Sequence, residues 1–75
     1  MFDLFNAYKI KDPAEIQKGV ILHFRDSEST YEVLEVVGNL ITARCLEACI
    51  ILYPQVTFRM DRVMEGGRIV PPPHG

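Results

Sequence analysis

Hydrophobic and polar residues alternate through the middle of the chain, and this period of two is typical of half-buried β-strands. In the first such segment Val20, Leu22 and Phe24 share the face that we expect to be buried. The same pattern, helped by β-branched and aromatic residues, recurs along the chain. It predicts strands over residues 20–24, 31–37, 40–45, 55–60 and 68–70.

The segments between these strands carry turn signals. The alternation slips by one position within 31–37, which predicts a β-bulge near Glu35. Gly38-Asn39 is typical of a two-residue hairpin turn. Residues 61–65 are too few for a stable helix, so we expect a single 3₁₀ turn there, ended by Gly66-Gly67.

The N-terminal region carries helix signals instead. Asp12, Pro13 and Glu15 form a capping-box pattern, and Gly19 offers a left-handed end one or two turns later. Ahead of them, apolar residues recur at spacings of three and four, which indicates a short amphipathic helix or a docking arm; they are Phe2, Leu4, Phe5 and Tyr8. We therefore expect an arm over 1–18, one domain over 19–70 and a disordered Pro-rich tail over 71–75.

The predicted order of elements resembles the SH3-like or Sm-like small barrel. Five strands, a long central hairpin and a helical turn before the last strand carry this resemblance over residues 19–70. It rests on element order alone and includes no motif, so no functional residue is transferred from it. The expected fold class is mainly β, a five-stranded barrel with a short N-terminal helical region.

Residues 45–53 support two interpretations. Cys45, Ala48, Cys49 and Leu52 fall on one face of a helix, whereas Ile50, Ile51 and Tyr53 favour a strand. A helix there would give an α+β fold, with an antiparallel sheet and one packed helix, in place of the barrel.

Composition narrows the class of protein. The chain has 75 residues, which is enough for one domain, and its charge is −2, with 48% hydrophobic residues. This composition excludes a disordered chain and a basic nucleic-acid arm. No signal peptide is expected, because the start carries Asp3 and lacks a positively charged region. No membrane span is expected, because the longest apolar run, 48–54, is far shorter than the roughly 20 residues that a span needs.

No catalytic or cofactor site is predicted. Cys45 and Cys49 lie among Ala, Leu and Ile, so we expect inert free thiols in a reducing, cytoplasmic setting. A zinc site is not expected, because His23 and His74 lie far apart and lack paired ligand spacing. The protein is therefore expected not to be an enzyme and to hold no cofactor.

Three arginines raise an alternative function. The alternation places one arginine on the outward face of each of three strands: Arg25, Arg44 and Arg59. If these strands are neighbours, the three side chains would form a stripe that could bind nucleic acid or another partner. The chain is acidic overall, and outward aromatic residues for base stacking are missing. An oligomeric barrel that binds nucleic acid or nucleotides is thus the second hypothesis.

The most unusual feature is the apolar run 48–54. On a strand, Ile50 and Leu52 would face one side while Ile51 and Tyr53 face the other, so one pair needs a second surface. The N-terminal Phe2, Leu4 and Phe5 could cover it, from the same chain or from a second subunit. We therefore predict a homo-oligomeric protein-interaction module, acting as an adaptor, assembly factor or small inhibitor of a larger complex.

Overall fold

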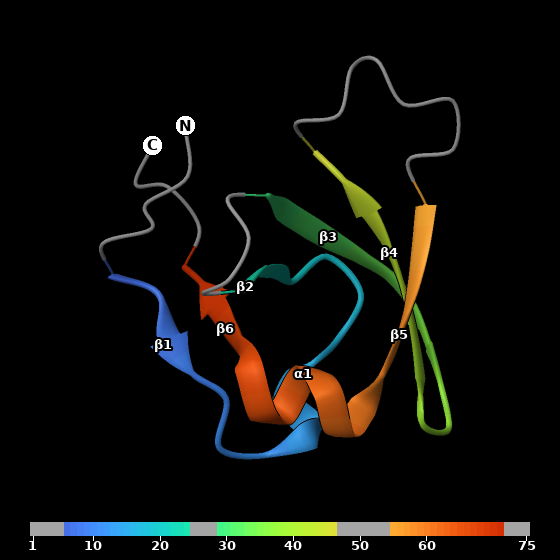
Figure 1. Ribbon diagram of the computed structural model, residues 1–75, viewed down its shortest axis with the longest axis horizontal. Coiled ribbons are helices and arrows are strands. Elements are labelled where there is room, and N and C mark those ends of the chain that lie inside the picture. The colour runs from blue at the N-terminus through green and yellow to red at the C-terminus, as the bar shows by residue number, and fades with distance from the viewer. Residues whose placement is uncertain (1–5, 25–28, 47–54, 72–75) are drawn as a thin grey trace.

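The computed structural model describes residues 6–24, 29–46 and 55–71, which form a six-stranded antiparallel sheet in the order β1-β6-β2-β3-β4-β5 (Figure 1). The strands are β1 (Tyr8–Lys9), β2 (Ile21–Phe24), β3 (Thr30–Val37), β4 (Leu40–Cys45), β5 (Gln55–Arg59) and β6 (Gly67–Val70). Two helical elements complete the described chain, η2 (Pro13–Glu15) and α1 (Met60–Gly66). The expected mainly β class is confirmed.

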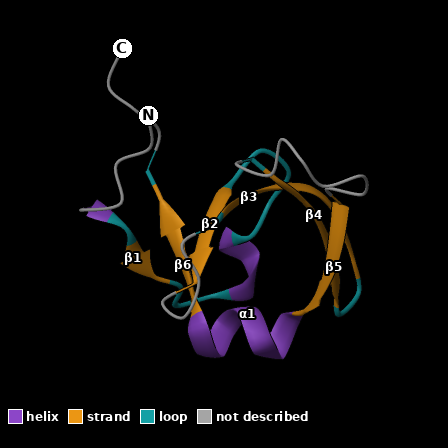
Figure 2. Cartoon of the chain, turned by 45° about the horizontal axis from the view of Figure 1, so that its top comes forward, coloured by secondary structure: helices purple, strands orange, loops and turns teal. Residues whose placement is uncertain are grey.

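The sheet has one more strand than the alternation predicts, and it is not closed. The additional strand, β1, is only two residues long and pairs with β6. It was missed because Tyr8 matches the helical spacing of the residues before it; the structure places Tyr8 in a strand. β1 and β5 are the two edges of the sheet, which curls so that α1 spans the space between β5 and β6 (Figure 2).

The core lies on the concave face of the curled sheet. Leu22 and Phe24 of β2 are buried there as the alternation predicts, together with Ile41 and Ala43 of β4. Ile10 and Ile16, which precede the predicted domain, are buried in the same core. Aromatic rings of Phe24, Tyr31 and Phe58 pack against one another, with centroids 4.9–5.9 Å apart.

The hairpin of β3 and β4 contains the predicted bulge. Val33 pairs with Ala43 and Glu35 pairs with Thr42, so Leu34 is an extra residue without a partner directly opposite. The bulge returns Val36 to the core side, where it packs against the core cluster. At the turn Gly38 has φ +57°, as the first central position of a type II′ hairpin turn requires.

The segment after β5 is an α-helix, and the prediction of a single 3₁₀ turn is wrong. Met60 begins α1 and does not continue the strand. Met60, Val63 and Met64 are spaced at i, i+3 and i+4, and all three pack on the core, with Val63 fully buried. Packing of one apolar face stabilises a helix that is too short to form alone.

The capping box at Asp12 is confirmed, but η2 ends at Glu15, so Gly19 does not end a helix as predicted. The Asp12 side chain accepts a hydrogen bond from the Ala14 N–H, and the Glu15 carboxylate accepts one from the Asp12 N–H. Gly19 has φ +93°, and its N–H donates to the Val33 carbonyl, which ties this segment to β3. Residues 16–18 are thereby held beside the bulge.

Candidate functional site

The outer face of β3, β4 and β5 is the most distinctive surface of the described chain. Cross-strand pairing arranges its side chains in rows, since directly opposite residues share a face of the sheet. The rows are Val37–Leu40–Arg59 beside the hairpin turn, Glu35–Thr42–Thr57 in the middle, and Glu32–Arg44–Gln55 at the far end. We call this surface the β3–β5 face.

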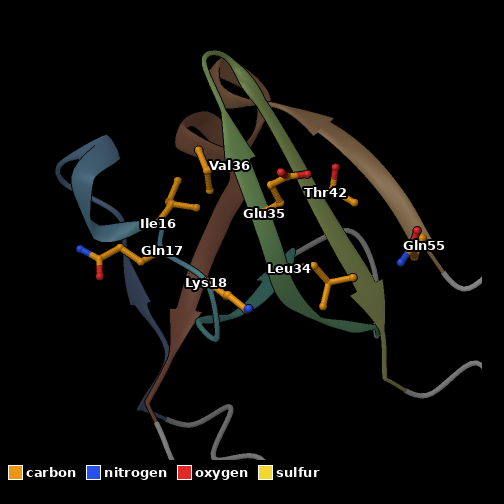
Figure 3. A pocket seen from close by; sticks show the side chains of 8 residues that line it. All are labelled: Ile16, Gln17, Lys18, Leu34, Glu35, Val36, Thr42 and Gln55. Carbon is orange, nitrogen blue, oxygen red and sulfur yellow. The ribbon is translucent and has the colours of Figure 1, made fainter.

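A hollow of about 690 Å³ crosses this face, from the segment at residues 16–18 to the start of β5 (Figure 3). The bulged Leu34 lines it with Val36 and Ile16, and these three residues supply its apolar lining. The remaining lining residues are polar: Gln17, Lys18, Glu35, Thr42 and Gln55. The bulge matters to the hollow because it adds Leu34 at a position that a regular strand would not provide.

An exposed apolar pair lies beside the hairpin turn. Val37 and Leu40 are directly opposite each other and are 63% and 51% exposed. Their outward position follows from the register, because their neighbours Val36 and Ile41 face the core. Two adjacent apolar side chains left in water are a surface that association can cover.

Two members of the predicted arginine stripe, Arg44 and Arg59, are exposed on neighbouring strands as expected, but they are not directly opposite each other. Arg44 is opposite Gln55, four positions before Arg59, which separates the two arginines by about 13 Å along the strand. Arg44 forms a 2.6 Å ion pair with Glu32, and the Arg59 Nε lies 3.7 Å from an Asp61 oxygen. Arg25 lies outside the described residues.

The nucleophile and metal candidates are not brought together either. Cys45 is a half-buried free thiol, opposite Tyr31 on the inner side of the sheet. His23 is on the outer side, because its neighbours Leu22 and Phe24 are in the core. Within residues 6–24, 29–46 and 55–71, no group of three His, Cys, Asp or Glu side chains is arranged to hold a metal ion.

Several predicted site residues lie outside the described ranges. They are the interface candidates Phe2, Leu4, Phe5, Ile50, Ile51, Leu52 and Tyr53, together with Cys49. The helical alternative for 45–53 also falls there, except that Cys45 ends β4. The contact predicted for the 48–54 run stays a prediction.

Sequence reasoning missed the surface that the structure assembles. The one-position slip in the alternation near Glu35 predicted the bulge. It did not predict that Leu34 would line a hollow beside residues 16–18. The sequence did contain a signal for the exposed apolar pair. Val37 and Leu40 are apolar residues on either side of a two-residue turn.

Comparison with protein-family models, with curated proteins and with solved structures gave no match. Among the described helices, none has the length and apolar character needed to cross a membrane.

Proposed function

We propose that this protein is a non-enzymatic protein-interaction module that binds a protein partner on the β3–β5 face. The observation that carries the proposal is the hollow, which apolar and polar side chains line together, next to the exposed pair Val37 and Leu40. Protein interfaces combine an apolar centre with a polar rim, and an anchoring side chain in a pocket contributes most of the affinity. The partner would insert a large apolar side chain beside Leu34.

The polar lining residues supply the polar part of such an interface. Gln17, Thr42 and Gln55 offer hydrogen-bonding groups, and Lys18 and Glu35 offer one charge of each sign. This balance favours a peptide or protein segment over a polyanion, because a phosphate backbone requires several unpaired cations. Adaptors, assembly factors and small inhibitors act through surfaces of this kind, in the reducing cytoplasm that the free thiol of Cys45 suits.

A peptide library displayed on phage tests the proposal with a defined probe. Selection on the full chain is expected to enrich peptides that share one aromatic or large aliphatic residue. Those peptides should lose binding to Leu34→Lys, which places a charge in the hollow, and keep binding to Lys11→Gln, an exposed residue that does not line the hollow. Circular dichroism on each variant checks that it folds.

Two results would overturn this function. One is a selection without enrichment, and the other is a set of peptides that bind Leu34→Lys as tightly as the wild type. Binding of a single-stranded oligonucleotide that weakens steeply with salt would instead support the nucleic-acid hypothesis, since an apolar contact does not depend on counterion release.

For the whole chain we further propose the SH3-like or Sm-like barrel. The order β6-β2-β3-β4-β5, with α1 immediately before β6, supports it, as does the curl of the sheet (Figure 2). Nuclear Overhauser contacts between side chains of β5 and β6 across the interior are expected. Their absence in solution would mean an open sheet.

A further inference from the structure

The free edge of β5 has its own hydrogen-bonding pattern. Met60 N donates to the Asn39 carbonyl at 2.7 Å, so Asn39 and Met60 are a hydrogen-bonded pair at the end of the β4–β5 ladder. Hydrogen-bonded and non-hydrogen-bonded pairs alternate in an antiparallel ladder. With the observed register, Phe58 and Val56 bond to β4, whereas the backbone N–H and C=O groups of Arg59, Thr57 and Gln55 point to the free edge.

No other strand of the described chain pairs with this edge, and β5 is the terminal strand of the sheet (Figures 1 and 2). It contains no proline and no bulge, two features that protect many edge strands, and its one charged residue is Arg59. As far as residues 6–24, 29–46 and 55–71 are concerned, the edge is therefore open to a further strand.

The sequence of β5, Gln-Val-Thr-Phe-Arg, is complementary to itself when two copies run antiparallel. A two-fold axis at Thr57 places Gln55 opposite Arg59 of the second copy and Val56 opposite its Phe58. Every outward N–H and C=O of the five residues then has a partner. Thr57 meets its own copy, a favourable cross-strand pair, and no like charges are opposed.

We propose that β5 pairs with β5 of a second copy of this chain, forming an isologous dimer with one continuous sheet. In this arrangement the β3–β5 faces of both copies lie on the same side of the sheet, because cross-strand neighbours share a face. Two hollows side by side would bind a partner with repeated anchors more tightly than one. The dimer does not depend on the partner function proposed above.

Charge substitutions at Gln55 test the register directly, by sedimentation velocity over a wide concentration range. Gln55→Glu places a carboxylate opposite Arg59 of the second copy twice in each dimer and should tighten the dimer severalfold. Gln55→Arg opposes like charges at the same two places and should weaken it by a similar factor. Gln55 is exposed, so both variants are expected to fold.

Thr57→Pro removes an N–H that faces the free edge while leaving the bonds to β4, and it should give a folded monomer. Thr57→Val keeps the N–H and the branched side chain and should remain dimeric. A wild type that stays monomeric at every concentration would overturn the proposal, as would equal dissociation constants for Gln55→Glu and Gln55→Arg. If Thr57→Pro does not fold, the Gln55 pair decides.

The dimer and the binding of a partner on the β3–β5 face can be tested independently of each other. Leu34→Lys should leave the dimer intact, and the wild type diluted below the dimer dissociation constant should still bind the selected peptides with the affinity of a single site. A monomeric wild type that binds them would remove the dimer alone.

Discussion

At the scale of single residues, two adjacent glycines have different roles. A Cβ on Gly67 would lie 2.7 Å from the Val63 carbonyl oxygen and 3.1 Å from a Val63 methyl, because β6 begins directly under the last turn of α1. A Cβ on Gly66 would meet nothing within 4 Å. Neither residue has a positive φ, so space, and not backbone conformation, requires glycine at position 67.

We therefore expect Gly67→Ala to destabilise the protein by about 1–3 kcal/mol, the usual cost of overpacking a filled site. Gly66→Ala is the matched control and should be neutral or should stabilise by about 0.5–1 kcal/mol, because alanine is the better helix former. Urea unfolding of the two variants measures the difference. Equal stabilities would mean that the helix end can move away from β6.

At the scale of elements, the β3 bulge adds one residue without changing the register around it. Val33 pairs with Ala43 and Val36 with Ile41 on either side of it. If Leu34 were removed, Glu35 would follow Val33 directly and the same pairs would form a regular ladder. The bulge is thus not needed to place the core residues, and its consequence is that Leu34 joins the residues that line the hollow.

Deletion of Leu34 should consequently give a folded chain with the same cross-strand pairs and without peptide binding. Leu34→Ala keeps the bulge and removes only the side chain, so it separates the effect of the backbone from that of the apolar contact. Cross-strand nuclear Overhauser contacts between residues 33 and 43 report the register. An unfolded deletion variant would show that the bulge is required for the curl of the sheet.

At the scale of the whole molecule, a chain of 75 residues has little stability to lose. A single small core of this size supplies roughly 3–5 kcal/mol of net stability. Ile41 of β4 is fully buried on the inner face of the sheet, whereas its neighbour Leu40 is 51% exposed on the other face. Adjacent residues of one strand therefore have very different importance for folding.

Ile41→Ala should cost about 2–5 kcal/mol, enough to leave much of the protein unfolded at room temperature. Leu40→Ala should change the stability by no more than about 0.5 kcal/mol. If Leu40 contacts the partner, that variant should bind the selected peptides less tightly while melting normally. Thermal unfolding followed by circular dichroism distinguishes the two variants.

Local signals in the sequence were sufficient for features that depend on neighbouring residues. The alternation of Leu22 and Phe24 with outward residues predicted the buried face of β2. The one-position slip in the alternation of β3 predicted its bulge. The capping box at Asp12 and the turn at Gly38 depend on hydrogen bonds and backbone angles within a few residues. Each of these is decided within one element, so the sequence alone predicts it.

Tertiary structure decided the features that depend on distant segments. Residues 60–66 form an α-helix because Val63 is buried in a core cluster that includes Leu22 and Val33, far away in the sequence, and packing outweighs the weak propensity of so short a segment. Tyr8 and Lys9 became a strand because β6 offered an edge. The candidate site also depends on contacts between distant segments. The register of β4 with β5 separates Arg44 from Arg59. The hydrogen bond from Gly19 to Val33 holds residues 16–18 beside Leu34.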